Sequence, residues 1–288
     1  MDKLYRVITH KSNFFTLENG DEQFTVKARG KLKRDGEIMV GDFVEVEGET
    51  EKVIKSVTER KNSLIRPSVA NVDQIVLVVS PQPEIDWFLI DKMVINCHEN
   101  GIECVICLNK TDLGENDYAK LVEQYSPDVV AVVKTCAEKG EWEELKPHLK
   151  DKLTCFAGQS GVGKSTLSNL IYGSSEQRVG EVSEKIGRGK NTTTTASIIT
   201  TADGYKLIDT PGFSMLDVFS VKHEDLALYY NEFVELADEC KFHPCTHTSE
   251  PNCAVKVAVE SGKINGERYE RYLKIFEEQK RIDKENRR

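Results

Sequence analysis

The fold of this 288-residue chain is decided by the stretch Gly158-Gln159-Ser160-Gly161-Val162-Gly163-Lys164-Ser165. It matches Gly-x-x-x-x-Gly-Lys-Ser/Thr, the pattern of a phosphate-binding loop. Residues 152–157 before it are typical of a short buried strand, and residues 165–172 after it place apolar side chains at helical spacing. Strand, glycine loop and helix N-terminus together present backbone N–H groups and a favourable dipole to an anion. The alternative is a glycine-rich turn that binds nothing, and the flanking strand and helix disfavour it.

The side chains of this loop have distinct expected roles. Lys164 is expected to reach the β- and γ-phosphates of a nucleotide, and the Ser165 hydroxyl is expected to bind Mg²⁺. The predicted contacts to the bound nucleotide in this segment are Gly158, Gln159, Ser160, Gly161, Val162, Gly163, Lys164, Ser165 and Thr166.

A second phosphate-side element is expected at Asp209-Thr210-Pro211-Gly212, which follows the strand-like residues 205–208. Asp209 would hold the Mg²⁺ through a water, and the Gly212 N–H would contact the γ-phosphate. The polar residues 187–195 between the two elements are interpreted as a switch loop with a Mg²⁺-ligating threonine, Thr193 or Thr194. A solvated turn is the alternative for this threonine run. The predicted switch residues are Thr193, Thr194, Asp209, Pro211 and Gly212.

The base of the nucleotide is specified by Asn109-Lys110-Thr111-Asp112, which ends a buried-strand pattern at residues 104–108. The Asp112 carboxylate can accept from the N1–H and N2–H₂ groups of guanine, a pattern that adenine does not offer. Thr135-Cys136-Ala137, after the strand 129–133, fits the second contact to guanine. Because the carboxyl ends of parallel strands meet at one sheet edge, these elements should converge there.

The order of these elements is unusual. In ordinary guanine-nucleotide switch proteins the phosphate loop comes first and the Asn-Lys-x-Asp element follows, whereas here residues 109–112 precede residues 158–165. The sequence therefore predicts a circularly permuted α/β GTPase domain. A P-loop ATPase or kinase with an accidental Asn-Lys-x-Asp is the alternative.

The first 60 residues predict a small barrel. Five short β-like segments, at 5–8, 13–17, 23–26, 43–46 and 51–57, are separated by turn residues with no helix between them. Such an oligonucleotide-binding (OB) barrel binds nucleic acid across its strands and loops. A basic run falls in its third connection, and a solvated loop is the alternative to an RNA contact there. The predicted RNA-binding residues are Lys27, Arg29, Lys31, Lys33 and Arg34.

A metal site is predicted near the C-terminus from Cys240, Cys245, His247 and Cys253. Three thiolates and an imidazole suit one closed tetrahedral zinc ion with a structural role, and the loop-rich surroundings have little core without it. His243 is the rival for the imidazole position. The remaining cysteines, including the Cys104–Cys107 pair inside an apolar strand, are expected to be core thiols.

With these motifs, the chain resembles the small-ribosomal-subunit biogenesis GTPase family (RsgA) over essentially its whole length. The resemblance implies three domains: an OB-fold RNA-binding domain at 1–64, a permuted GTPase domain at 65–220 and a mostly helical zinc-binding domain at 221–288. It also favours His247 over His243. It implies GTP and GDP with Mg²⁺ as ligands, the small ribosomal subunit and its rRNA as partners, and a checkpoint role late in subunit maturation.

The sequence departs from a self-sufficient GTPase at the residues that would orient the attacking water. Phe213 stands where Ras-like proteins carry a glutamine, and its ring can neither donate nor accept a hydrogen bond. Asn191 occupies the place of a histidine ahead of the threonine run, and could position a water but not act as a base. We expect slow hydrolysis that the small subunit stimulates, with Lys164, Ser165, Asp209, Gly212 and Asn191 as the catalytic set. A nucleotide-gated RNA-binding module that does not hydrolyse GTP is the alternative.

Bulk properties are consistent with a cytoplasmic multidomain protein, and a monomer is expected because no dimerisation signal is evident. No stretch reaches the roughly 18 apolar residues of a membrane span, and no secretory signal opens the chain. The net charge is −9, but residues 1–66 carry 13 basic and 12 acidic side chains and residues 262–288 carry 9 and 6. A polyanionic partner would therefore meet local basic surfaces at the two ends rather than a basic protein.

Overall fold

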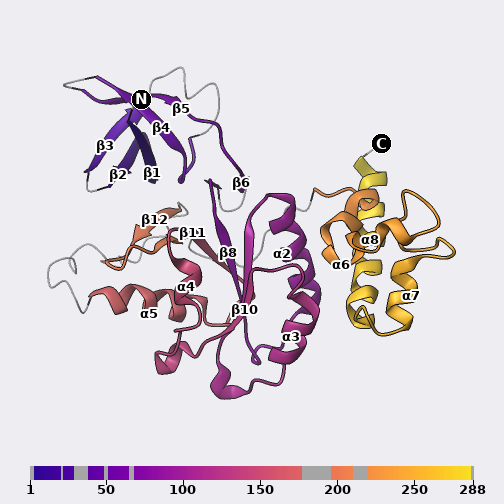
Figure 1. The fold of residues 1–288 in the computed structure, drawn as a ribbon. Coiled ribbons are helices and arrows are strands. Elements are labelled where there is room, and N and C mark those ends of the chain that lie inside the picture. Colours follow the sequence, from indigo (N-terminus) through magenta and orange to yellow (C-terminus); the bar gives the residue numbers. More distant parts are fainter. Residues whose placement is uncertain are drawn as a thin grey trace.

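The computed structural model describes residues 3–20, 22–28, 38–48, 51–64, 68–176, 196–209 and 220–286. Figure 1 shows three parts along the chain: a small barrel, a central sheet with helices, and a C-terminal group of helices. This confirms the predicted fold class, an N-terminal barrel, a central α/β domain and a mostly helical C-terminal part. No helix of the described residues is long and apolar enough to cross a membrane.

The barrel closes through five antiparallel and parallel pairings. Its strands follow the order β1-β2-β3-β5-β4, and β4 pairs back onto β1. Alternate side chains of these strands, such as Val7, Leu17 and Val44, fill the interior and are fully buried. The strands are β1 (Leu4–Lys11), β2 (Phe14–Asn19), β3 (Glu22–Ala28), β4 (Phe43–Glu47) and β5 (Val53–Val57).

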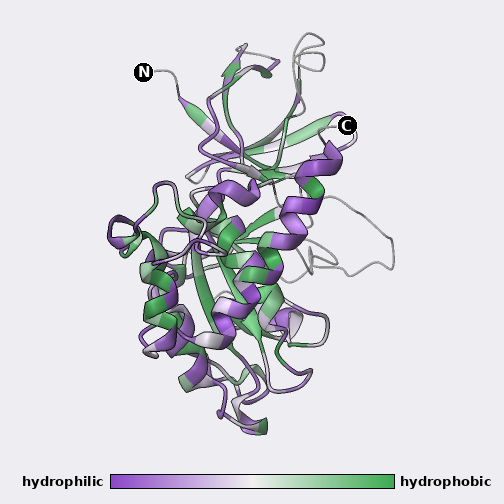
Figure 2. Cartoon of the chain, turned by 90° about the vertical axis from the view of Figure 1, so that its right-hand side faces the viewer, coloured by the Kyte–Doolittle hydropathy of each residue, from purple (hydrophilic) through white to green (hydrophobic). Residues whose placement is uncertain are grey.

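The central sheet has the strand order β10-β9-β8-β11-β13-β12, parallel except for β12. All six residues of β8 are buried, as expected for a strand covered on both faces. The strands are β8 (Gln74–Val79), β9 (Glu103–Leu108), β10 (Ala131–Lys134), β11 (Leu153–Ala157), β12 (Ser197–Thr200) and β13 (Lys206–Asp209). In Figure 2 these strands form a hydrophobic centre, and the helices around them carry both hydrophobic and hydrophilic residues.

Helices cover both faces of this sheet. Ile75, Leu77 and Val79 of β8 belong to the core that contains residues of α2 and α3, while Val76 and Val78 belong to the core that contains residues of α5. The helices are α2 (Trp87–Glu99), α3 (Tyr118–Tyr125), α4 (Lys146–Leu149) and α5 (Lys164–Glu176), with short 3-10 turns at Thr111–Leu113 and Ala137–Lys139.

The ends of α2 are set by neighbouring residues in the sequence. The Asp86 carboxylate caps its N-terminus by accepting from the Leu89 N–H at 3.0 Å. Gly101 follows its C-terminus with a φ of +60°, a conformation that favours glycine.

The C-terminal part consists of η3 (His223–Tyr229), α6 (Asn231–Val234), η4 (Ala237–Glu239), α7 (Ala254–Glu260) and α8 (Gly266–Asn286). The apolar stripe of α8 packs in its own domain, since Tyr272 and Phe276 are buried in one core there. That core also includes Ile95 from α2 of the central domain. The C-terminal part is therefore packed directly on the central domain.

Two features of the barrel's attachment are not evident from the sequence pattern. Residues 60–70 are largely polar in sequence, yet they contain the paired strands β6 (Ser63–Leu64) and β7 (Val69–Ala70), and Leu64 and Val69 are buried. The amide of Asn62 makes this possible, because it donates to the Val72 carbonyl and accepts from the Val72 N–H, both at 2.9 Å. In addition, Thr9 of β1 pairs with Ser197 of β12, so the barrel and the central sheet form one continuous ladder of strands.

Candidate functional site

The phosphate-binding loop lies between β11 and α5, as the sequence predicts. Two of its glycines cannot be replaced by a residue with a side chain without a clash. A Cβ on Gly158 would stand 2.1 Å from the Val78 carbonyl oxygen, and one on Gly163 would stand 2.3 Å from the Asn109 amide nitrogen. Both residues also have φ values of +131° and +96°, in the region that favours glycine. Close approach of neighbouring backbone and side chains therefore dictates the glycine pattern.

Lys164 begins α5, and its ammonium turns back over the loop. Its Nζ donates to the carbonyls of Gly158 and Gln159, each at 2.7 Å. Burial lowers the pKa of this half-buried ammonium. A nearby phosphate would favour the charged form again, so the environment suits a lysine that neutralises an anion.

Asn109 joins three elements of the site. Its amide nitrogen donates to the Val162 carbonyl at 2.9 Å, and its amide oxygen accepts from the Thr135 hydroxyl at 3.0 Å and the Ala137 N–H at 3.1 Å. The base-side motifs and the phosphate loop are thus held by one buried side chain. This is possible because β9, β8 and β11 are neighbours whose carboxyl ends meet at the same edge.

The Asp112 carboxylate, which the sequence predicts to contact the base, is positioned by Cys136. The Cys136 thiol donates to Asp112 Oδ1 at 3.2 Å, which leaves the second carboxylate oxygen free to meet a ligand. Lys110, at a left-handed φ of +60°, donates to the carbonyls of Gln82 at 2.8 Å and Gly161 at 2.5 Å. The arrangement therefore presents a carboxylate beside the phosphate loop.

The segment 80–86 is a part of the site that the sequence analysis missed. The Gln82 carbonyl of this segment accepts from Lys110, and the Asp86 N–H donates to the Gln159 side-chain oxygen at 3.4 Å. Its position after β8, next to the phosphate-loop strand, was a usable signal, since every βα connection at this edge reaches the same crevice.

Other predicted residues are placed less completely. Asp209 ends β13, one strand beyond β11, at the same carboxyl edge. The predicted Asn191, Thr193, Thr194, Pro211 and Gly212 lie outside the described residues, as do Arg29, Lys31, Lys33 and Arg34 of the basic run. Lys27 of β3 is described, and its ammonium lies 5.3 Å from the centre of the Phe14 ring, which is 48% exposed.

The predicted metal ligands come together in the C-terminal part. Cys240, Cys245, His247 and Cys253 each offer one ligand atom, and these atoms lie within 4.8 Å of one another. His247 Nδ1 is 3.6 Å from the Cys240 sulfur and 3.3 Å from the Cys253 sulfur, and the two sulfurs are 3.9 Å apart. His247 is therefore the imidazole of this cluster, as predicted, and His243 is exposed.

The cluster fits a tetrahedral zinc ion. With Zn–S bonds of about 2.3 Å, the ligand atoms of a tetrahedron stand about 3.8 Å apart, close to the separations seen here. Burial raises the pKa of the Cys245 thiol to about 12 and lowers the pKa of His247. The imidazole is thus neutral and ready to bind, whereas the thiols need a bound cation to ionise.

The loop that carries His247 is held from both sides. The Tyr269 hydroxyl of α8 donates to the His247 carbonyl at 2.7 Å, and the Tyr272 hydroxyl donates to the Thr246 carbonyl. The Glu250 carboxylate accepts from the N–H groups of Thr246 at 2.8 Å and of Thr248 at 2.9 Å. These contacts orient the ligands before any metal binds.

Comparisons with known proteins agree with this geometry. Residues 57–219 match the family model described as RsgA GTPase. The "Small ribosomal subunit biogenesis GTPase RsgA" of Caldanaerobacter subterraneus subsp. tengcongensis is 41% identical over 285 residues, which are 97% of this chain and 96% of that protein. The chain belongs to the RsgA GTPase family.

Two solved structures extend the likeness to three dimensions. The crystal structure of YjeQ from Thermotoga maritima superimposes with a TM-score of 0.82 at 39% identity, over 96% of this chain and 98% of that one. The structure titled "YloQ, a circularly permuted GTPase" gives 0.78 at 32% identity, over 97% and 95%. As a member of the RsgA GTPase family the chain is a GTP hydrolase with a permuted domain, so the alternative interpretation as an ATPase or kinase is wrong.

Proposed function

We propose that this protein is a ribosome-dependent GTPase that acts as a checkpoint late in maturation of the small ribosomal subunit. The observation that carries the proposal is the convergence of a phosphate loop and a guanine-reading motif at one sheet edge, in a chain of the RsgA GTPase family with a barrel before and a metal cluster after that sheet. The named relatives are GTPases of small-subunit biogenesis.

Binding of GTP would use the residues that the fold brings together. Asp112 would accept from the guanine edge, and the loop from Gly158 to Thr166 would surround the phosphates, with Lys164 leaving its carbonyl partners for them. Ser165 and Asp209 would hold a Mg²⁺ ion, which neutralises charge on the phosphates when it is bound. The side chains predicted to complete this set are Asn191, Thr193, Thr194, Pro211 and Gly212.

The two flanking domains would recognise rRNA. In the barrel, Lys27 with the exposed ring of Phe14 offers a cation and a stacking surface, and the basic residues Arg29, Lys31, Lys33 and Arg34 follow along the chain. The zinc-bearing domain, with its ion held by Cys240, Cys245, His247 and Cys253, would provide a second contact. We assign residues 1–64, 65–220 and 221–288 to these three units of a cytoplasmic monomer.

Catalysis is expected to be slow without the subunit. Phe213 and Asn191 offer no base for the attacking water at neutral pH, so the ordered ribosomal complex would have to position it. GTP-bound protein would dock on the subunit, and hydrolysis to GDP and phosphate would release it.

The test is steady-state hydrolysis of GTP by the purified protein with isolated small subunits, and with large subunits as the control. We expect low turnover alone and a strong increase with small subunits only. Asp112→Asn should weaken the binding of GTP, measured by competition between nucleotides, while leaving the fold intact. GTP binding with no stimulated turnover would instead support a nucleotide-gated RNA-binding module that does not hydrolyse GTP.

A further inference from the structure

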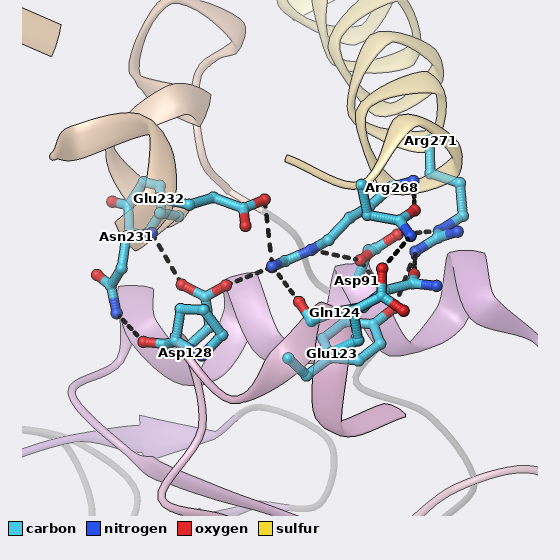
Figure 3. Close-up of polar contacts among 12 residues, drawn as sticks. Asp91, Glu123, Gln124, Asp128, Asn231, Glu232, Arg268 and Arg271 are labelled. Carbon is cyan, nitrogen blue, oxygen red and sulfur yellow. Dashed lines mark hydrogen bonds and ion pairs between the residues drawn. The ribbon is translucent and has the colours of Figure 1, made fainter. Parts of the chain in front are cut away.

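A buried group of charged residues joins the C-terminal domain to the GTPase domain. Figure 3 shows Arg268 and Arg271 of α8 pointing toward α2 and the end of α3, where Asp91 and Asp128 meet them. We call Asp91, Asp128, Glu232, Arg268 and Arg271 the interdomain charge cluster. None of the motifs discussed above includes any of these residues.

Arg268 lies at the centre of this cluster and is only 1% exposed. Its guanidinium donates to Asp128 Oδ2 and to the Gln124 carbonyl, and its Nε lies 3.6 Å from Asp91 Oδ1. It also lies between two aromatic rings, at 4.9 Å from the centre of the Tyr125 ring and 5.0 Å from that of Tyr230. Arg268 therefore crosses from its own domain into a water-poor pocket of the GTPase domain.

Arg271, one helical turn later, contacts the same helix α2. Its Nε donates to Asp91 Oδ2, and its Nη2 donates to the Gln124 side-chain oxygen at 2.6 Å. The Tyr125 hydroxyl donates to Asp91 Oδ1 at 2.9 Å. Both oxygens of Asp91 are thus satisfied by hydrogen bonds to charged or polar donors.

The cluster contains one carboxyl group more than it contains cations. Asp91 and Asp128 are both hydrogen-bonded, the latter also to the Asn231 N–H at 2.8 Å. Glu232 of α6 is different: its buried Oε1 makes no hydrogen bond and lies 3.4 Å from Arg268 Nη1. With all groups ionised the cluster would hold a net buried negative charge, which is costly in a region with little water.

We propose that Glu232 makes the attachment of the C-terminal domain to the GTPase domain depend on protonation. In the docked state Glu232 is held as a neutral acid, and its ionisation weakens the interface. The extra proton belongs to Glu232 because it is the carboxyl of the cluster with the fewest hydrogen bonds.

The electrostatic surroundings of Glu232 support this assignment. Burial raises its pKa to about 7; Arg268 opposes the shift, while Asp128, Asp91 and Glu235 add to it. These are the charged groups that face it from α8, from the end of α3, from α2 and from its own helix end. The phenol of Tyr230 borders the same pocket and is neutral across this range, since burial raises its pKa as well.

The sign of the effect follows from the direction of this shift. Because the docked state holds the proton more tightly than the solvated acid, docking is strongest at low pH and weakens as the pH rises toward and through about 7. The equilibrium ratio of docked to undocked protein should fall about tenfold between pH 6 and pH 8. Loss of a zinc ion at low pH would act in the opposite direction, so it cannot imitate this result.

Trp87 provides a reporter for the experiment. Its ring stacks on Tyr125 with centres 6.4 Å apart and lies 5.7 Å from the Arg271 guanidinium, so its fluorescence should change when the interface opens. Urea titrations of the full-length Trp142→Phe protein would be followed by Trp87 fluorescence at pH values from 6 to 8. The chain with both tryptophans, followed by circular dichroism, provides the same comparison if Trp142→Phe folds poorly.

The decisive variant is Glu232→Gln, with Glu235→Gln as the matched control on the exposed side of the same helix end. We expect Glu232→Gln to remove about a tenfold pH-dependent change in the opening constant that the parent shows. Glu235→Gln should keep most of this change, because Glu235 contributes less to the raised pKa of Glu232 than Asp128 or Asp91 does. If Glu232→Gln keeps the pH dependence of the parent, the proton resides elsewhere in the cluster and the proposal is wrong. A parent protein whose opening is unaffected by pH would also overturn it.

Discussion

The GTPase domain is joined to its two neighbours by chemically opposite contacts. On the barrel side the junction consists mainly of backbone pairs and amides: Thr9 pairs with Ser197, and the Asn71 amide donates to the Gly41 carbonyl at 3.1 Å. On the C-terminal side the junction consists of buried ions around Arg268. Amides do not titrate, whereas a buried carboxyl group with few hydrogen-bond donors does, so we expect the C-terminal junction to respond more strongly to protons than the barrel junction.

A buried ion pair at the barrel junction, between Asp42 and Arg60, does not change this contrast. Asp42 is fully buried and accepts from Arg60 at 2.7 and 2.8 Å, as a two-pronged pair. It also accepts from the Met39 N–H at 2.8 Å, so one cation faces one well-satisfied anion. The interdomain charge cluster instead has three carboxyl groups around two guanidinium groups. The number of charges, and not simply their burial, separates the two junctions.

Removing the metal ligand His247 should break the C-terminal junction most severely. His247→Ala removes one of the four ligands and should reduce bound zinc from about one ion per chain to nearly none. The effect should be large, because structural zinc contributes about 10–16 kcal/mol of apparent folding free energy in small domains. The loop that carries it contacts α8 through Tyr269, so Arg268 and Arg271 should lose their positions too. The measurement is zinc content together with protease protection of α8.

The control is His243→Ala, which removes an exposed imidazole two peptide bonds from Cys245. This variant should retain its bound zinc and the protection of α8 from protease. If His243→Ala loses zinc while His247→Ala keeps it, the ligand assignment is wrong. In both variants the barrel junction should remain closed.

Truncation of Arg268 should be the next largest effect. Arg268→Ala leaves Asp128 and part of Asp91 buried without a cation, and such a loss typically costs about 3–5 kcal/mol of unfolding free energy. Urea unfolding at pH 7 measures it. Arg281→Ala, on the exposed side of the same helix, should cost less than about 0.5 kcal/mol, and equal effects of the two would contradict the role of the cluster.

On the barrel side, Asn71→Ala tests the neutral junction. It removes two hydrogen bonds, to Gly41 and from the Lys61 N–H at 3.0 Å, and leaves alanine at a φ of +56°. The free energy of unfolding should fall by about 1–3 kcal/mol because of the unsatisfied groups and by about 1–2 kcal/mol because of the strained backbone. Asn71→Gly should show only the first of these costs, because glycine adopts this φ without strain. The loss should be the same at pH 6 and pH 8, and a pH-dependent loss would remove the contrast between the junctions.

The sequence predicted the nucleotide and metal sites because their chemistry is local. The phosphate loop, residues 109–112 and the cluster around His247 each need fixed residue types at fixed spacing, and the structure brings each together. The strand pattern of β8 and the caps of α2 at Asp86 and Gly101 were equally readable, since they depend on neighbouring residues only.

The junctions were not predicted because their partners are far apart in the chain. Arg268 meets Asp128 across 140 positions, and nothing in the charged pattern of α8 distinguishes Arg268, which is buried, from Arg281, which is exposed. The pairing of Thr9 with Ser197 is similar, because a β-strand shows its apolar face in sequence but not its edge partner. The contacts of Arg268 and Arg271 with α2 and the end of α3 also join the C-terminal domain directly to the GTPase domain.

The smallest effect should come from the rim of the C-terminal junction. Lys92 of α2 donates to both Glu278 oxygens at 2.8 Å, but the two side chains are 30% and 33% exposed. Water screens this pair and its side chains lose entropy when they are held together, so Lys92→Met should cost less than about 1 kcal/mol in urea unfolding. Its methylene stem is kept, which preserves the packing beside Phe88. A cost similar to that of Arg268→Ala would mean that the whole interface, rather than its buried centre, carries the attachment. A small cost that disappears at high salt would place the coupling between the domains in the water-excluded cluster, where the excess carboxyl of Glu232 is found.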